Sequence, residues 1–141
     1  MSTKKITIDR AISHVREFHN AFGIENANEL TAALEERDLR LRFELMREEN
    51  EEYLDAAKNG DLIEVADALG DMLYILCGTI LKHGLQEKIG EVFEEIQRSN
   101  MSKLDTNGQA IYREDGKVLK SELYFRPNIA EILNAPMEEV V

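Results

Sequence analysis

Residues 61–82 read DLIEVADALGDMLYILCGTILK, and this stretch carries the clearest helical pattern in the chain. Asp61 is a suitable N-cap with Glu64 three residues later, and His83-Gly84 ends the pattern. From Met72 onward the segment is apolar on almost every side, so we expect this helix to be buried over most of its surface. Its broad apolar face comprises Val65, Leu69, Met72, Leu73, Leu76 and Ile80.

The rest of the chain is also read as mainly helical. Apolar periodicity predicts further helices over residues 8–22, 38–58, 86–98 and 129–133, and a short helix through Leu30 to Leu34. The turn dipeptides Asn107-Gly108 and Asp115-Gly116 predict a small β-hairpin over residues 105–120, ahead of a C-terminal tail over residues 121–141. Four main helices with short connections and no linker predict one all-α domain over residues 1–141, with a four-helix-bundle-like fold.

The composition excludes several classes of protein. The 141 residues include 28 acidic and 17 basic side chains, and the net charge is −11. Such a charge argues against binding to nucleic acid polymers or to an anionic membrane. No apolar run approaches the roughly 18 residues of a membrane span, and the first residues lack the apolar block of a signal peptide. Cys77 stands alone, so we expect a cytoplasmic protein without an internal disulfide, in which Cys77 is a buried apolar residue.

Carboxylates occupy core-facing positions on the helix over residues 38–58. On a helical wheel, five side chains share a sector of about 80°. They are Leu41, Leu45, Glu49, Glu52 and Ala56. Glu48 lies at the edge of this sector, whereas Glu51 and Asp55 point toward solvent. Two glutamates are therefore expected in the stripe that faces the core, where a carboxylate without a partner is costly.

The helix over residues 61–82 has an acidic stripe of its own. Glu64, Asp67 and Asp71 follow one another at helical spacing, and Tyr74 and Gly78 continue the stripe. This helix has no basic residue between Asp61 and Leu81, so a divalent cation is the better source of compensating charge. Ligands that are all oxygen favour Mg²⁺, Mn²⁺ or Ca²⁺ over zinc.

Three blocks of sequence resemble a known family. EENEE at Glu48–Glu52 and EVADALGD at Glu64–Asp71 are similar to the EExxE…ExxD signature of the all-α NTP pyrophosphohydrolase superfamily. VREFHNAFG at residues 15–23 and RSNMSK at residues 98–103 resemble its MazG-like, phosphoribosyl-ATP pyrophosphohydrolase-like members. One position departs from the signature, because Ala68 stands three residues before Asp71. Either Asp67 replaces that acid, or Glu64 and Asp67 form the ExxD pair.

The resemblance implies a Mg²⁺-dependent enzyme, with Mn²⁺ as a possible substitute, that cuts an NTP or dNTP into a monophosphate and pyrophosphate. Metal ligands would come from Glu49, Glu52, Asp67, Asp71 and Glu64. Glu48 and Glu49 are the candidate catalytic residues, with Glu48 placed to orient or deprotonate the attacking water. Substrate contacts are expected from Tyr74, Asn100, Lys103, Lys120 and Tyr124. The resemblance also implies a homodimer, in which the apolar helix over residues 61–82 is covered by a second subunit.

Two other classes of function stay open. A non-catalytic regulator that binds nucleotide or Mg²⁺ on the same fold is one, because Ala68 interrupts the signature. A structural helical interaction protein is the other, and it predicts no response to metal or nucleotide. A ferritin-like di-iron bundle is disfavoured, since none of His14, His19 and His83 follows a glutamate by three residues.

Overall fold

In the computed structural model, which describes residues 5–137, the chain is all-α, as the sequence predicts. The helices are α1 (Ile8–Ala21), α2 (Glu36–Lys58), α3 (Leu62–Lys82), α4 (Ile89–Met101) and α5 (Ile129–Asn134). The chain divides into two compact units with a boundary between Gln86 and Glu87. The expectation of one domain over residues 1–141 stays a prediction. None of the helices within residues 5–137 combines the length and hydropathy that crossing a bilayer requires.

The helix that dominates the sequence has the predicted ends. Asp61 caps α3, where its side chain accepts a hydrogen bond from the backbone N–H of Glu64 at 3.1 Å. His83 is the C-cap, and Gly84 follows with a φ of +69°, a left-handed conformation that glycine adopts without strain. α2 begins two residues earlier than predicted and ends at Lys58, before Asn59 and Gly60.

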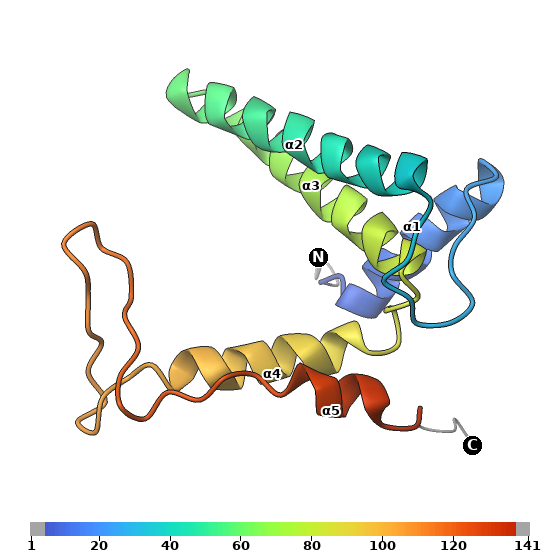
Figure 1. Cartoon of the computed structure of the whole chain (residues 1–141). Coiled ribbons are helices and arrows are strands. Elements are labelled where there is room, and N and C mark those ends of the chain that lie inside the picture. The colour runs from blue at the N-terminus through green and yellow to red at the C-terminus, as the bar shows by residue number, and fades with distance from the viewer. Residues whose placement is uncertain (1–4, 138–141) are drawn as a thin grey trace. The chain divides into compact units, whose positions relative to one another are not determined.

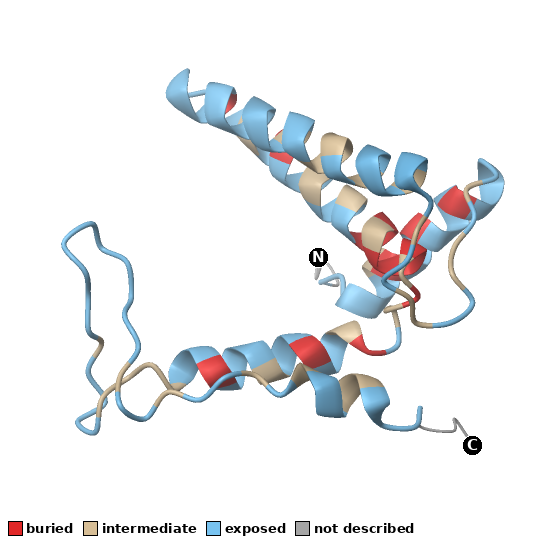
Figure 2. Cartoon of the chain, in the orientation of Figure 1, coloured by how far each residue is buried: buried red, intermediate tan, exposed pale blue. Residues whose placement is uncertain are grey.

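The first unit is built on the pair α2 and α3, which run side by side in opposite directions, with α1 packed against α3 (Figure 1). Buried residues concentrate where α1 meets the C-terminal half of α3 (Figure 2). This core contains Ile12, Val15, Cys77, Ile80 and Leu81. The burial of Cys77 is confirmed, and its apolar surroundings raise the pKa of the thiol. The core thus fixes α1 against the α3 turns that follow Tyr74.

The rest of α3 is more exposed than its sequence predicts. Leu69, Leu73 and Leu76 keep between 44% and 49% of their surface in water, and Leu62 and Ile63 keep almost four-fifths. The prediction of a helix buried over most of its surface is therefore wrong for its N-terminal two-thirds within this chain. The physical reason is that α2 covers only one side of this segment, while α1 packs mainly against the C-terminal end of α3.

The predicted helix through Leu30 to Leu34 does not form. The backbone N–H of Thr31 donates to the His83 carbonyl at 3.0 Å, and its hydroxyl accepts from the N–H of Ala33 at 3.0 Å. The hydroxyl competes with helical hydrogen bonding, while the bond to His83 holds the segment extended against the end of α3.

In the second unit α4 starts three residues later than predicted, and the C-terminal segment packs against it. The Ser99 hydroxyl donates to the Phe125 carbonyl at 2.8 Å, and the Lys88 ammonium donates to the Ala135 carbonyl at 2.9 Å. Both Lys88 and Ser99 are buried. α5 follows within one residue of its predicted end, while residues 138–141 of the predicted tail lie outside the described residues.

The predicted β-hairpin is reduced to a turn. A single antiparallel bridge joins Tyr112 to Val118 around Asp115-Gly116, and residues 5–137 contain no β-strand. Gly116 adopts a φ of +88°, so the turn chemistry is as the sequence indicates. A strand pair alone is only marginally stable in water, and residues 111–120 are all exposed, so nothing supports a longer ladder.

Candidate functional site

Three carboxylates from two helices act on the carboxyl group of Glu49 in the first unit. Glu49 and Glu52 come from α2, and Asp67 and Asp71 come from α3. The pKa of Glu49 is raised from 4.5 to about 7. Burial is the largest cause, followed by the adjacent Glu52 carboxyl and by the negative charges of Asp71 and Asp67. The antiparallel pairing of α2 and α3 therefore brings the two acidic stripes together, which the sequence pattern alone does not require.

Glu49 has a carboxylate oxygen with no protein partner. Its Oε2 atom is buried and accepts no hydrogen bond from any described residue. A buried oxygen without a donor costs stability unless a proton or a cation satisfies it. This orphaned oxygen, in a cluster whose charged groups acting on it are all carboxylates, fits a hard divalent cation such as Mg²⁺ or Mn²⁺. Within residues 5–137 no group of three or more acidic, histidine or cysteine side chains is already arranged to hold a metal ion.

The other predicted acids lie at the margin of this cluster. Glu48 is exposed on α2, next to Glu49. Glu64 is exposed in the first turn of α3, where its backbone N–H is bonded to the Asp61 cap. Glu51 points to solvent and forms an ion pair with Arg47 at 2.7 Å, which confirms the predicted solvated face of α2. Ala68 is buried beside the exposed Asp67, so the missing acid of the signature is a core position in this chain.

A cavity of about 670 Å³ adjoins the acid cluster. Glu49 and Asp71 line it at one end, and α2 contributes Leu41, Arg42 and Leu45 further along. The remaining lining residues come from α1, from α3 and from the two loops that flank them. They are Phe18, His19, Gly23, Ile24, Glu25, Arg37, Asp38, Tyr74, Ile75 and Lys82. One continuous space therefore connects the carboxylates with apolar walls and with a group of basic side chains.

Two aromatic side chains form part of its wall. The rings of Phe18 and Tyr74 meet edge to face, with 5.7 Å between their centroids. Both rings keep about two-fifths of their surface accessible, at 39% and 42%. Tyr74 thus lines the cavity with an accessible aromatic surface, and its contact with substrate stays a prediction.

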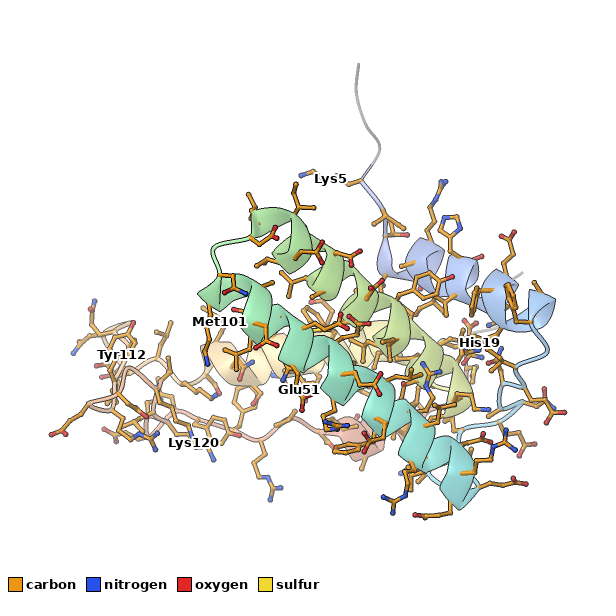
Figure 3. All side chains as sticks on the ribbon, turned by 90° about the horizontal axis from the view of Figure 1, so that it is seen from above. Lys5, His19, Glu51, Met101, Tyr112 and Lys120 are labelled. Atoms are coloured by element: carbon orange, nitrogen blue, oxygen red, sulfur yellow. The ribbon has the colours of Figure 1, made fainter. Side chains whose placement is uncertain are left out.

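Basic groups gather at the end of the cavity away from Glu49. Lys82 is buried, donates to the Glu25 carbonyl at 2.7 Å and lies 3.7 Å from Asp38. His19 is also buried, and burial is the largest cause that lowers its pKa, with the charges of Arg42 and Lys82 acting in the same direction. Figure 3 shows His19 where α1 approaches the C-terminal part of α3. This end of the cavity therefore contains Arg37, Arg42 and Lys82 together with the carboxylates of Glu25 and Asp38, and Lys82 pairs with Asp38.

The remaining predicted contacts belong to the second unit. Asn100 is exposed in the last turn of α4, and its carbonyl accepts from the N–H of Lys103 at 3.1 Å. Lys120 lies over the ring of Tyr124, with 4.8 Å from Nζ to the centroid, so these two side chains are brought together. Figure 3 labels Lys120 beside the turn that contains Tyr112.

Sequence reasoning missed the basic end of the cavity. The sequence pattern assigns no role to Arg42, and it indicates no substrate contact for His19. A signal was present, because Arg42 precedes Glu49 by seven residues and so lies on the same face of α2. Gly78 stands at the equivalent spacing after Asp71 on α3. The pairing of these two positions depends on how the helices pack, and periodicity within one helix does not supply it.

Comparisons with known proteins identify a family for most of the chain. The sequence profile of the phosphoribosyl-ATP pyrophosphohydrolase family matches residues 15–100. Among solved structures, the chain is similar to a candidate NTP pyrophosphohydrolase from Exiguobacterium sp. 255-15, with 25% identity and a TM-score of 0.48. That similarity covers 92% of this chain and 95% of the other. No curated protein matches the sequence.

Proposed function

Because this chain belongs to the phosphoribosyl-ATP pyrophosphohydrolase family, we propose that it hydrolyses a nucleoside triphosphate to a monophosphate and pyrophosphate. The substrate is an NTP or dNTP, and the reaction serves to clear nucleotides from the cytoplasmic pool. Water attacks at the α–β linkage, so that the bond to the bridging oxygen breaks and pyrophosphate leaves. The family match and the acid cluster support this proposal together.

The observation that carries the proposal is the state of Glu49. Its Oε2 atom is buried without a partner, in a cluster of carboxylates that borders a cavity. Such an arrangement destabilises the fold when no cation is bound, because each negative charge raises the free-energy cost of ionising its neighbours. A divalent cation bound with a polyphosphate would remove that cost, because the cation reverses the sign of the local charge.

In this proposal Glu49, Glu52, Asp67 and Asp71 hold Mg²⁺ or Mn²⁺. Asp67 and Asp71 are preferred to Glu64 because they are among the groups whose charge acts on Glu49. The bound cation would neutralise the triphosphate and polarise its phosphorus–oxygen bonds. The carboxylates therefore fix the α-phosphate end of the substrate at the junction of α2 and α3.

Glu48 is proposed as the general base. It is exposed next to Glu49, so its carboxylate can accept the proton of an attacking water at the edge of the cluster. Tyr74 contributes to the wall of the cavity. Further contacts to the substrate are proposed for Asn100, Lys103, Lys120 and Tyr124 of the second unit.

A homodimer with a bundle of helices at its centre is part of the proposal. The apolar side chains of α3 that the chain leaves in water form a row at helical spacing, and it includes Leu62, Leu69, Leu73 and Leu76. Monomeric proteins seldom expose a contiguous apolar surface of this kind. A second copy would present the same row, and a two-fold axis would bury both.

The test is release of pyrophosphate from a panel of canonical and modified NTPs and dNTPs, with Mg²⁺ and with EDTA. Glu49→Gln keeps the shape of the side chain and removes its charge, and it is expected to lower kcat/KM by about 100-fold or more. Glu51→Gln is the matched control, since Glu51 lies on the same helix but faces solvent beside Arg47. It is expected to retain wild-type activity.

Turnover in EDTA, or full activity of Glu49→Gln, would contradict the proposed role of the cluster. Tight binding of nucleotide with Mg²⁺ and no turnover would instead identify a regulator. The buried Ala68 at the departing position of the signature is the feature that favours that second outcome. No response to either metal or nucleotide would favour a structural interaction protein.

A further inference from the structure

Two hydrogen bonds from one edge of its guanidinium group fix the side chain of Arg42 against α3. Its Nε donates to the Thr79 hydroxyl at 3.0 Å, and its Nη2 donates to the Ile75 carbonyl at 2.7 Å. These two bonds occupy the side of the fork that joins α2 to α3. The other edge, formed by Nη1 and the second proton of Nη2, has no hydrogen-bond or ion-pair partner among residues 5–137, and Arg42 is one of the residues that line the cavity. Burial of this cation lowers the pKa of Arg42.

Gly78 makes room for Arg42 and His19 at one point of α3. A Cβ atom at Gly78 would lie 2.5 Å from Nη2 of Arg42 and 2.9 Å from Nε2 of His19, closer than atoms tolerate. The two side chains therefore converge above this glycine. Each side chain is hydrogen-bonded to another segment of the chain. The fold therefore keeps the two side chains together at this point.

His19 adds an acceptor beside the donors of Arg42. Its side chain is 2% exposed, and Nδ1 lies 2.6 Å from the Asn26 amide oxygen. Because an oxygen can only accept, Nδ1 carries the proton and Nε2 of the neutral ring keeps a lone pair. The convergence point thus presents two N–H donors next to one acceptor.

The donors of Arg42 and the acceptor of His19 lie at a distance from the acid cluster that suits a nucleobase. Arg42 precedes Glu49 by seven residues, which places it about 10 Å further along the axis of α2. That distance is comparable to the span of a nucleoside measured from its 5′-phosphate. Between the two ends the walls are apolar and aromatic, with Phe18, Leu45 and Tyr74 among the lining residues. A flat base fits between them, with its polar edge toward Arg42.

We propose that Arg42, together with His19, recognises the edge of a 6-oxopurine, and that this chain prefers guanine and hypoxanthine nucleotides to adenine nucleotides. The inference rests on the proposed pyrophosphohydrolase activity and names its substrate class. The edge of a 6-oxopurine presents the acceptors N7 and O6 and the donor N1–H in that order. Arginine pairs with N7 and O6 through two parallel bonds. The lone pair of His19 accepts from N1–H.

Adenine is the mismatched base for this site. It carries an amino donor where O6 stands, so its N–H groups would face those of Arg42, and it has no proton at N1. Leaving buried donors without acceptors is costly, which is how a hydrogen-bonding pocket rejects a substrate of the same shape. Shape therefore contributes little to this discrimination, and the exchange of one oxygen for one amino group contributes most of it.

The first experiment varies the substrate and leaves the protein unchanged. ITP and ATP differ at C6 and N1 only, and 7-deaza-GTP differs from GTP by the loss of the N7 acceptor. We expect kcat/KM for ITP to exceed that for ATP by about ten- to a hundredfold, and 7-deaza-GTP to be about tenfold poorer than GTP. Equal values for ITP and ATP, with pyrophosphate released from both, would overturn the inference and leave the proposed function intact.

A binding measurement separates recognition from catalysis. Titration calorimetry with IMP and AMP needs no turnover, so it reports on the array even if the chain is inactive. Binding of IMP at least tenfold tighter than AMP, without hydrolysis of any NTP, would support the inference and overturn the proposed function. Equal affinities would overturn the inference.

Arg42→Lys tests the residue itself, because it keeps the charge and removes the fork. We expect the ratio of kcat/KM for ITP and ATP to fall toward one, with the larger loss on ITP. An unchanged ratio in a folded variant would overturn the role of Arg42. Should the variant fail to fold, the comparison of GTP with 7-deaza-GTP on the wild-type protein still decides the question.

Discussion

The direction of the Glu49 side chain follows from the sequence pattern of α2, whereas its pKa depends on tertiary packing. The helical wheel places it in the stripe of α2 that faces the core, and in the structure one of its oxygens is buried without a partner. The pattern could predict the direction of the side chain because the geometry of a helix is local. It could not predict the pKa, since Asp67 and Asp71 reach Glu49 only when α3 packs beside α2.

The metal-free protein is expected to lose stability as pH rises from about 4.5 to about 7, between the ordinary pKa of Glu49 and its pKa in the fold. The folded-state pKa of Glu49, about 7, lies above its ordinary value of 4.5. The side chain therefore carries no penalty while it is protonated in both states, and the full penalty once it ionises in the fold. Unfolding in denaturant with EDTA, at about pH 5 and about pH 8, should show a larger loss for the wild type than for Glu49→Gln.

Mg²⁺ should restore the stability lost at about pH 8 in the wild type and have little effect on Glu49→Gln, because the cation replaces the missing proton. Identical pH dependence of the two proteins in EDTA would contradict the raised pKa of Glu49. Identical behaviour with and without Mg²⁺ would contradict its role as a ligand.

Among the helices, α3 has a start that the sequence predicts and a later segment whose surroundings the sequence does not predict. Its cap at Asp61 follows from residues three apart in sequence, and such contacts are readable from the chain. Gly78 reads only as a weak point in an apolar helix, with an intrinsic cost of about 1 kcal/mol relative to alanine. The structure gives the reason for this glycine, because Arg42 from α2 and His19 from α1 occupy the space that a side chain at position 78 would need.

Gly78→Ala is therefore expected to destabilise the protein by about 1–3 kcal/mol, although alanine favours the helix. The added methyl group would displace Arg42, so discrimination between ITP and ATP should fall as well. Gly70→Ala on the same helix is the matched control, since nothing lies within 4 Å of its Cβ position. It is expected to be neutral or to stabilise by up to about 1 kcal/mol.

Thermal or denaturant unfolding of both variants checks this expectation. A stabilising effect of the same size at Gly70 and at Gly78 would show that Arg42 and His19 do not hold the positions described above.

At the scale of the whole molecule, the exposed leucines of α3 are the main feature that one chain leaves unexplained. Leu69 and Leu73 stand one helical turn apart and are nearly half exposed. Leu69→Lys with Leu73→Lys should abolish the proposed dimer, because two charges on each copy would meet across a two-fold axis. Leu123→Lys is the control, since Leu123 is equally exposed, at 51%, but belongs to the second unit.

Analytical ultracentrifugation of the three proteins measures the outcome. We expect a dimer for the wild type and for Leu123→Lys, and a folded monomer for the double variant. A monomeric wild type would overturn the dimer, and an unaffected dimer in the double variant would exclude this face of α3 as the interface.

Local signals in the sequence predict the five helices and the inward direction of Glu49, but Glu52, expected in the same core-facing stripe, is exposed. Caps such as Asp61, glycines after helix ends and apolar periodicity act between residues at most a few positions apart, so they can be read without the fold. Where local signals compete with a distant bond the prediction failed, as at Thr31, whose bond to His83 prevents a helix.

The side chains that share the cavity cannot be identified without the packing of the helices. Glu49 meets Asp71, and Arg42 meets His19 above Gly78, because α1, α2 and α3 pack in one particular arrangement. These partners lie between about twenty and sixty positions apart in the chain, and no periodicity couples residues at such distances. The physical reason is that a helix fixes the direction of its own side chains, whereas the contacts between helices depend on the packing of whole faces.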